Sequence, residues 1–213
     1  MNRNKLFEKV DIYPVTCEAL SRGRSDLFVL KELISAGTRI IQLREKGYTK
    51  RELYNLAVEF RRITSRHGVL LIINDHVDVA LMVKADGVHL GQEDLPFAAA
   101  RKLAPKLLIG ISVHNLLEAR AAQKGGADYI NVGPIFKTST KDEKPIGLKA
   151  FKLISSKVKI PITVMGGINE DRLPQVLKAG ARKIALISAL TKAPDIGRAF
   201  KRIRKQIEAA SSH

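Results

Sequence analysis

The sequence predicts an α/β protein, a single-domain (β/α)₈ barrel of the TIM-barrel type that spans residues 1–213. Eight short apolar runs recur along the chain, and segments with helical periodicity separate them. Parallel strands that are buried on both faces have such continuous apolar runs, and eight of them with intervening helices match a closed barrel. The eight predicted strands are residues 10–16, 39–45, 69–74, 87–91, 107–112, 129–133, 161–166 and 183–188.

Helices are predicted between these runs, and residues 51–68 show the clearest pattern. Leu53, Leu56, Phe60 and Ile63 recur at three- and four-residue spacing, so they share one face of a helix. Several strands follow a glycine-containing turn, where glycine ends a helix and redirects the chain. Further helices are predicted over residues 76–83, 95–103, 169–178 and 191–206.

An open, doubly wound sheet is the alternative architecture. It usually carries a glycine-rich GxGxxG fingerprint after its first strand, and residues 15–25 contain none. No Pro-, Gly- or Ser-rich linker divides the chain, so one domain is expected. The longest irregular stretch, residues 135–147, is predicted to be a lid or a binding loop, because long loops in compact barrels are usually functional.

The formal net charge of +16 raises the possibility of a nucleic-acid-binding protein. The cations, however, are scattered over the expected outer faces of helices, and aromatic residues make up only 5% of the chain. We therefore expect phosphorylated small molecules as partners, and no nucleic acid. No apolar run reaches the roughly 18 residues of a membrane span and no signal peptide is evident, which predicts a cytoplasmic protein without a membrane partner.

A polar cluster ends the second predicted strand. Successive side chains of a strand point to opposite faces, so Gln42, Arg44 and Lys46 lie on one side and Leu43 and Glu45 on the other. A guanidinium can fork across two anionic oxygens and an ammonium acts as a point charge, so this set suits a diphosphate. The alternative is a strand that simply ends in solvated charge.

Two carboxylates follow the third and fourth strands. The active site of a barrel is built beyond the carboxyl ends of its strands, so Asp75 and Asp94 are expected at one mouth. Oxygen ligands of this kind suit Mg²⁺ that also binds diphosphate oxygens. Each aspartate also precedes a predicted helix, and N-capping is the alternative role.

Other polar residues are expected at the same mouth. Asn74, Ser112 and Thr138 follow strands three, five and six, and Ser188 follows strand eight. The Gly166-Gly167 turn and residues 187–189 are predicted to hold a second phosphate through backbone N–H groups, although a glycine pair alone also permits a tight turn. His89 is expected to be a hydrogen-bonded barrel residue, whereas His114 is an acid-base group, a helix cap or a packing residue.

Seven motifs stand in order along the chain: QLREK at 42–46, IINDHVDVAL at 72–81, ADGVHLGQEDL at 85–95, IGISVHN at 109–115, GADYINVGPIFKTSTK at 126–141, GGI at 166–168 and ISAL at 187–190. Taken together, they resemble the thiamine-phosphate synthase family, also called thiamine-phosphate pyrophosphorylase. The resemblance implies an enzyme, a transferase that joins 4-amino-2-methyl-5-(diphosphooxymethyl)pyrimidine to 4-methyl-5-(2-phosphooxyethyl)thiazole with Mg²⁺, giving thiamine phosphate and diphosphate.

The resemblance also implies a role for each matching residue. The catalytic residues would be Arg44, Lys46, Ser112 and Lys141, and the metal ligands Asp75 and Asp94. The pyrimidine diphosphate site would comprise Gln42, Leu43, Arg44, Glu45, Lys46, Asn74, Ser112 and Lys141. The thiazole phosphate site would comprise Thr138, Ser139, Thr140, Gly167, Ile187 and Ser188.

The family mechanism is dissociative: diphosphate leaves the pyrimidine methylene carbon, and the thiazole nitrogen captures the cation. Two alternatives stay open, a thiazole tautomerase-like relative that transfers a proton with a histidine and a basic RNA-binding module without catalysis. The sequence leaves the oligomeric state open, with a homodimer as one alternative.

Overall fold

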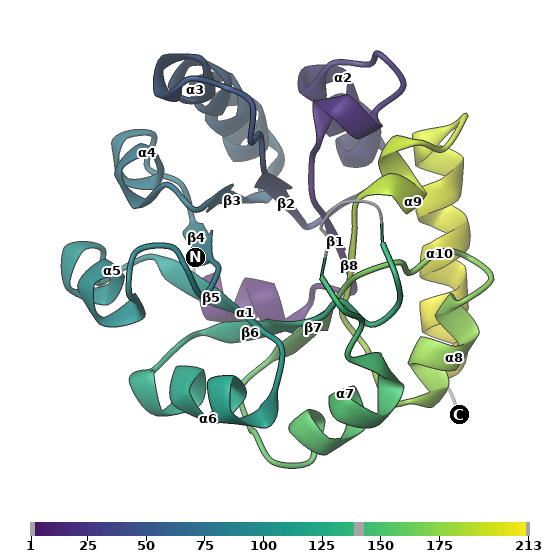
Figure 1. The fold of residues 1–213 in the computed structure, drawn as a ribbon. Coiled ribbons are helices and arrows are strands. Elements are labelled where there is room, and N and C mark those ends of the chain that lie inside the picture. The colour runs from purple at the N-terminus through teal and green to yellow at the C-terminus, as the bar shows by residue number, and fades with distance from the viewer. Residues whose placement is uncertain (1–2, 139–142, 212–213) are drawn as a thin grey trace.

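Eight parallel strands form one sheet that curls into a barrel with helices around it, in a computed structural model of the chain (Figure 1). The structure describes residues 3–138 and 143–211. The predicted (β/α)₈ fold class is confirmed, and each strand overlaps its predicted run. The strands are β1 (Ile12–Pro14), β2 (Ile40–Leu43), β3 (Leu70–Asn74), β4 (Gly87–Leu90), β5 (Leu108–Val113), β6 (Tyr129–Val132), β7 (Ile162–Val164) and β8 (Ile184–Leu186).

The strands follow the order β1-β8-β7-β6-β5-β4-β3-β2, and every pair is parallel. The first and second strands meet through a single bridge between Val15 and Gln42. The Thr16 N–H donates to the carbonyl oxygen of Gln42 at 2.9 Å, just beyond the end of β1. This hydrogen bond closes the barrel between β1 and β2, next to Gln42, the first residue of the QLREK motif.

Helices flank the strands as the periodicity predicts, with two differences at the chain ends. A short helix precedes the first strand, and the predicted helix over 191–206 is shifted: a separate short helix ends at Thr191, and the long helix runs from Ile196 to Ser211. The helical elements are α1 (Arg3–Glu8), the 3₁₀ turn η1 (Glu18–Leu20), α2 (Asp26–Ser35), α3 (Lys50–His67), α4 (Val77–Met82), α5 (Phe97–Leu103), α6 (Leu116–Gly125), α7 (Gly147–Ser155), α8 (Leu173–Lys178), α9 (Ser188–Thr191) and α10 (Ile196–Ser211).

The division between α9 and α10 has a local cause. Pro194 disfavours helical backbone at the residue before it, so the chain leaves the helix there. Asp195 then starts a new helix, because its Oδ1 accepts a hydrogen bond from the Arg198 N–H at 2.7 Å. The helix α8 begins four residues later than predicted: its N-cap residue is Arg172, which makes no side-chain capping bond, and Asn169 Oδ1 accepts from the Arg172 N–H at 3.0 Å in the turn before it.

The helix α3 shows why its sequence folds as predicted. Thr49 and Glu52 form a reciprocal capping box at its start, and Gly68 ends it with a left-handed φ of 64°. Leu53 and Phe60 of its apolar face are buried against the barrel. This packing orients the β2–α3 connection, which carries the charged part of QLREK.

Two apolar layers enclose the strands. The larger lies between the barrel and the surrounding helices, and the smaller fills the barrel interior around Tyr13, Ile72 and Tyr129. The helix α1 lies across the amino-terminal end of the barrel, and its Phe7 ring stacks on Tyr129 with centroids 4.4 Å apart (Figure 1). One end of the barrel is thus closed by apolar packing, and the polar residues gather at the other.

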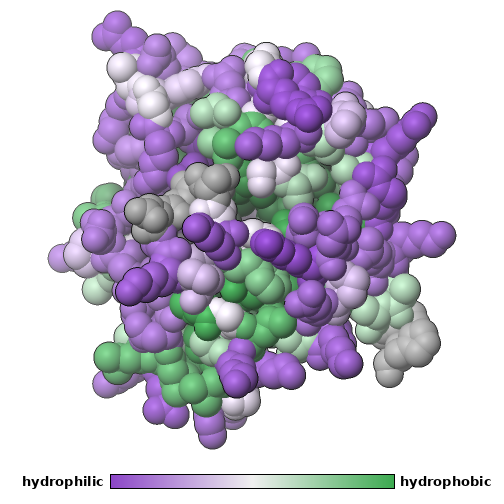
Figure 2. All heavy atoms as spheres, turned by 45° about the vertical axis from the view of Figure 1, so that its right-hand side comes forward, coloured by the Kyte–Doolittle hydropathy of each residue, from purple (hydrophilic) through white to green (hydrophobic). Residues whose placement is uncertain are grey.

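The outer surface is largely polar. On the face shown in Figure 2, hydrophilic side chains predominate, and hydrophobic atoms show in the central hollow and in a patch at the lower left. Exposed cations such as Lys201, Arg202 and Lys205 stand on the outer side of α10, as the scatter of charge predicts. Within residues 3–138 and 143–211, no helix has the length and apolar character that crossing a membrane requires.

Candidate active site

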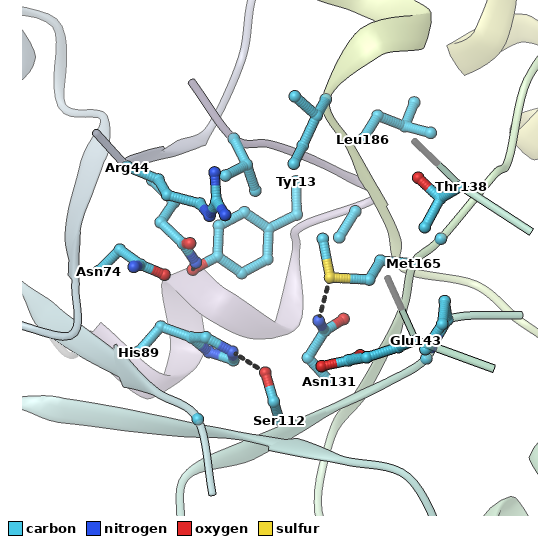
Figure 3. Close-up of a pocket in the computed structure, with 18 of the residues that line it drawn as sticks. Tyr13, Arg44, Asn74, His89, Ser112, Asn131, Thr138, Glu143, Met165 and Leu186 are labelled. Atoms are coloured by element: carbon cyan, nitrogen blue, oxygen red, sulfur yellow. Dashed lines mark hydrogen bonds between the residues drawn. The ribbon is translucent and has the colours of Figure 1, made fainter. Parts of the chain in front are cut away.

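A pocket opens at the carboxyl ends of the strands, where the barrel architecture predicts the active site. Figure 3 shows Arg44, Asn74 and His89 on one side of it and Thr138 and Leu186 on the other, around the ring of Tyr13. The predicted site residues that line the pocket are Gln42, Arg44, Lys46, Asn74, Asp75, Asp94, Ser112, Thr138, Gly167, Ile187 and Ser188.

The QLREK motif divides between two environments, as strand alternation predicts. Gln42, Arg44 and Lys46 line the pocket. Leu43 is fully buried in the layer between the barrel and the helices. The Glu45 carboxylate faces the start of η1, where its Oε1 accepts a hydrogen bond from the Glu18 N–H at 2.9 Å. Arg44 and Lys46 therefore supply the fixed positive charge of this part of the pocket.

Asp75 and Asp94 lie together at the pocket edge. Lys46 Nζ contacts Asp75 Oδ2 at 2.6 Å, and the Gly91 N–H donates to Asp94 Oδ2 at 2.7 Å. The pKa of Asp94 is raised, first by burial and then by the neighbouring Asp75 carboxyl.

Neither aspartate caps the helix that follows it. The N-cap residues of α4 and α5 are His76 and Pro96, and neither makes a side-chain capping bond. Asp75 instead adopts a left-handed φ of 62°, a conformation that few non-glycine residues take, and its N–H donates to the His89 carbonyl oxygen at 2.8 Å. The capping alternative is thus wrong for both residues, and their carboxylates are directed to the pocket.

The acid pair fits a magnesium ion that is shared with a phosphorylated substrate. Mg²⁺ typically binds one or two protein carboxylates and completes its shell with phosphate oxygens and water. Among the described residues, no cluster of three or more His, Cys, Asp or Glu side chains forms a self-sufficient metal cage. Asp75 and Asp94 would therefore hold the ion only together with ligand oxygens.

The opposite side of the pocket comes from the ends of β7 and β8. Gly166 and Gly167 have positive φ values of 99° and 62°, and a Cβ on Gly166 would lie 2.4 Å from Pro134 Cα. These glycines permit the tight turn, and they also let the backbone border the pocket beside Ser188. The predicted residues Ser139, Thr140 and Lys141 lie outside the described residues, as does the centre of the 135–147 loop.

Several residues of the pocket were not predicted because they lie within strands or in the long loop. Tyr13, Asn131 and Met165 point into the pocket (Figure 3), and Asn131 Nδ2 contacts Met165 Sδ at 2.6 Å. Glu143 also lines it. Polar residues inside apolar runs, such as Tyr13 in IYP and Asn131 in YINV, are the sequence signal that would have identified them.

His89 and His114, the two histidines that line the pocket, each have partners at both ring nitrogens. His114 Nδ1 lies 2.9 Å from Glu118 Oε2, and its Nε2 lies 3.5 Å from Glu143 Oε2. His89 Nδ1 lies 3.1 Å from Tyr129 Oη, and its Nε2 lies 2.9 Å from Ser112 Oγ. The prediction of His89 as a hydrogen-bonded barrel residue is confirmed.

Behind the QLREK motif lies a second acidic group, formed by Glu18, Asp26 and Glu45. Asp26 is only 2% exposed, and neither of its carboxyl oxygens has a hydrogen-bond partner among the described residues. Burial, and then the neighbouring Glu45 and Glu18, raise the pKa of Asp26 to about 9. Asp26 therefore retains its proton at neutral pH, which lessens repulsion behind the motif.

The chain is similar over nearly its whole length to known proteins. The family model described as thiamine monophosphate synthase matches residues 12–190. This chain belongs to that family. Thiamine-phosphate synthase from Chloroflexus aurantiacus is 48% identical over 195 residues, which cover 91% of this chain and 90% of the relative. As a member of the thiamine monophosphate synthase family, the chain is an enzyme, a transferase of thiamine biosynthesis.

Solved structures agree with the family assignment. The structure of thiamine phosphate pyrophosphorylase from Pyrococcus furiosus has a TM-score of 0.88 and 40% identity, and the match covers 98% of each chain. A 3-hexulose-6-phosphate synthase has a TM-score of 0.69 at only 18% identity, so it shares the barrel fold alone. The family and the fold predicted from the sequence are both confirmed.

Proposed function

We propose that this enzyme condenses 4-amino-2-methyl-5-(diphosphooxymethyl)pyrimidine with 4-methyl-5-(2-phosphooxyethyl)thiazole to give thiamine phosphate and diphosphate. One observation carries the proposal: Arg44, Lys46 and the Asp75–Asp94 pair line one pocket in a chain of this family. Two fixed cations beside two carboxylates, of the kind that bind Mg²⁺ in proteins, suit a diphosphate leaving group. The roles of the other substrate-binding residues are those that the family resemblance implies.

The proposed reaction is a dissociative substitution. The bond between the pyrimidine methylene carbon and the diphosphate oxygen breaks, and diphosphate leaves with the bonding electron pair. The thiazole nitrogen then donates its lone pair to that carbon and forms the new C–N bond. No side chain has to remove a proton in these two steps, so catalysis depends on charge and position.

Arg44 and Lys46 would stabilise the leaving group, because they border the same part of the pocket as the acid pair. Mg²⁺, when held by Asp75 and Asp94, would add positive charge next to the departing oxygens. Ile168 and Ile187 contribute apolar wall to the pocket, which limits the access of water to a reactive cation.

The tautomerase alternative is less consistent with this pocket. It requires a histidine that offers a ring nitrogen to the substrate, whereas both ring nitrogens of His89 contact protein hydroxyls and both of His114 face carboxylates. A monophosphate substrate also has little use for paired cations and paired carboxylates. The geometry therefore favours the synthase.

The test is a direct product assay. With both phosphorylated substrates and Mg²⁺, the protein is expected to form thiamine phosphate and diphosphate in equal amounts. Arg44→Ala should lower kcat/KM by about 10²–10³-fold, the usual cost of losing one group that stabilises transition-state charge. A folded wild-type protein that forms no thiamine phosphate under these conditions would refute the proposal.

Arg39 provides a matched control at the opposite end of β2. It is half-exposed and pairs with Asp11 at 3.2 Å, away from the pocket. Arg39→Ala removes the same type of charge from the other flank of the same strand and should leave kcat/KM within about twofold, since exposed ion pairs contribute little. Equal losses in both variants would mean that general charge, and not the position of Arg44, supports activity.

A further inference from the structure

We propose that Tyr13, Tyr129 and His89 form a proton-ordered chain from Gln42 to Ser112, which makes the enzyme select an aminopyrimidine over an oxopyrimidine. The chain holds the Gln42 carbonyl as an acceptor and the Ser112 hydroxyl as a donor toward the substrate. The identification of the ligand as a pyrimidine rests on the proposed function. The direction of the protons rests only on contacts within the protein.

The five side chains are linked by four contacts through the barrel. Gln42 Nε2 donates to Tyr13 Oη at 3.0 Å, and Tyr13 Oη lies 2.8 Å from Tyr129 Oη. His89 Nδ1 lies 3.1 Å from Tyr129 Oη, and His89 Nε2 lies 2.9 Å from Ser112 Oγ, the contact drawn in Figure 3. The chain therefore begins and ends at residues of the predicted pyrimidine site.

Only one direction of the protons gives every buried hydroxyl proton an acceptor among these contacts. The Tyr13 hydroxyl accepts from the Gln42 amide N–H, and its own proton is paired in this chain only when it is donated to Tyr129. Tyr129 must then donate to His89 Nδ1, which places the ring proton on Nε2. His89 Nε2–H donates to Ser112 Oγ, and the Ser112 proton is left to point into the pocket.

The surroundings keep this order rigid. Tyr13 and Tyr129 are almost completely buried, and burial raises the pKa of both phenols, so each keeps its proton. Phe7 stacks on one side of Tyr129, and the His89 ring stacks on it with centroids 5.6 Å apart. A buried chain of this kind cannot reverse one bond without leaving a donor or an acceptor unpaired.

The backbone provides room for the chain at a single glycine. His89, Gly110 and Tyr129 stand side by side in consecutive strands. A Cβ on Gly110 would lie 2.0 Å from Tyr129 Cζ, so the missing side chain lets the phenol cross β5 toward His89. The strand order and this one glycine together bring Tyr129 within reach of the histidine.

The two ends of this hydrogen-bond chain match the donor and the acceptor on one edge of an aminopyrimidine ring. An aminopyrimidine presents an N–H donor next to a ring-nitrogen acceptor, which complements the Gln42 carbonyl and the Ser112 hydroxyl. The 4-oxo analogue exchanges the donor and the acceptor along that edge. Sites that are built to hydrogen-bond one pattern reject the other strongly, because buried polar groups are left unpaired.

The first test does not depend on activity. Nitrogen-15 NMR of the histidine side chains in the free enzyme, with His89 assigned by a His89→Gln variant, reports which ring nitrogen carries the proton. The expected result is a neutral His89 with its proton on Nε2. A proton on Nδ1 would reverse every bond of the chain and overturn the inference, whether or not the proposed function holds.

The second test uses substrate selectivity. Wild-type kcat/KM should favour the amino substrate over its 4-oxo analogue by on the order of 10³-fold. Tyr129→Phe should reduce this ratio at least tenfold, and should have no further effect on it in a Ser112→Ala background, since both changes break the same chain. Phe7→Leu, which removes packing on Tyr129 but no hydrogen bond, should retain the wild-type ratio.

The outcomes separate the two proposals. A wild type that makes thiamine phosphate but shows equal selectivity in Tyr129→Phe would overturn the chain and leave the synthase intact. A Phe7→Leu variant that loses selectivity as fully as Tyr129→Phe would also overturn it, because packing and not proton order would then set the ratio.

Discussion

Replacing Asp26 with Asn should change how the stability of the protein depends on pH. Asp26 is 2% exposed, and burial together with Glu45 and Glu18 raises its pKa to about 9. The native state keeps this proton, whereas the unfolded chain releases it above about pH 4. The unfolded state therefore binds fewer protons, so Asp26 lowers the free energy of unfolding progressively as the pH rises from about 4 to 9.

The size of the effect follows from proton linkage. A difference of one bound proton corresponds to a slope of about 1.4 kcal/mol per pH unit, and this slope holds wherever the native pKa lies above the pH window. Between pH 5.5 and 7.5 the wild type should lose about 2.7 kcal/mol relative to Asp26→Asn. For a domain of this size that corresponds to a difference in Tm of roughly 5–11 °C.

The assay is urea unfolding of both proteins at pH 5.5, 6.5 and 7.5. Comparing the free energies of unfolding of the two proteins removes the contribution of groups, such as histidines, that titrate alike in both. Asp26→Asn should become the more stable protein as the pH rises. Parallel pH dependences would mean that the Asp26 carboxyl is ionised in the native state, and the account of this acidic group would fail.

Asp78 supplies the control because it also stands in the first turn of a helix. Burial raises its pKa, but hydrogen bonds from Lys50 and the Val79 N–H outweigh that effect and lower it. Asp78 is thus ionised in both the native and the unfolded state above pH 5.5. Asp78→Asn should therefore show the same pH slope as the wild type in this window.

Three further changes probe the metal site, the barrel interior and a helix cap. Asp94→Asn should raise the Mg²⁺ concentration for half-maximal velocity by about tenfold or more, and a magnesium titration that matches the wild type would exclude Asp94 as a ligand. Gly110→Ala should cost about 1–3 kcal/mol in thermal unfolding, because the new Cβ meets the Tyr129 ring; an unchanged Tm would contradict that close approach. Thr49→Ala should cost about 1 kcal/mol by removing the capping box, with kcat unchanged, and a loss of kcat would show that the β2–α3 connection depends on this cap.

The sequence was sufficient to predict the fold because two periodicities are strong in it. Buried parallel strands such as β3 are continuously apolar over residues 70–73, and α3 repeats its apolar residues at helical spacing. Alternation also predicted the two sides of QLREK correctly. These features depend on neighbouring residues, so they can be read without knowing the tertiary structure.

Features that depend on distant contacts could not be predicted. The six-residue α1 buries only Phe7, too little for a periodic signal, and its place under the barrel depends on stacking with Tyr129. In the hydrogen-bond chain, Tyr129 contacts Tyr13 and His89, which lie 116 and 40 residues away from it in the sequence. The raised pKa of Asp26 likewise arises from Glu45, which is near only in the folded protein.

A crystal grown with Mn²⁺ and inorganic pyrophosphate tests most directly whether the barrel mouth holds a diphosphate between fixed cations and the acid pair. Anomalous diffraction should place a metal ion on both Asp75 and Asp94, with the pyrophosphate oxygens shared among that ion, Arg44 and Lys46. Pyrophosphate bound away from Arg44 and Lys46, or a metal ion that touches neither aspartate, would contradict the account.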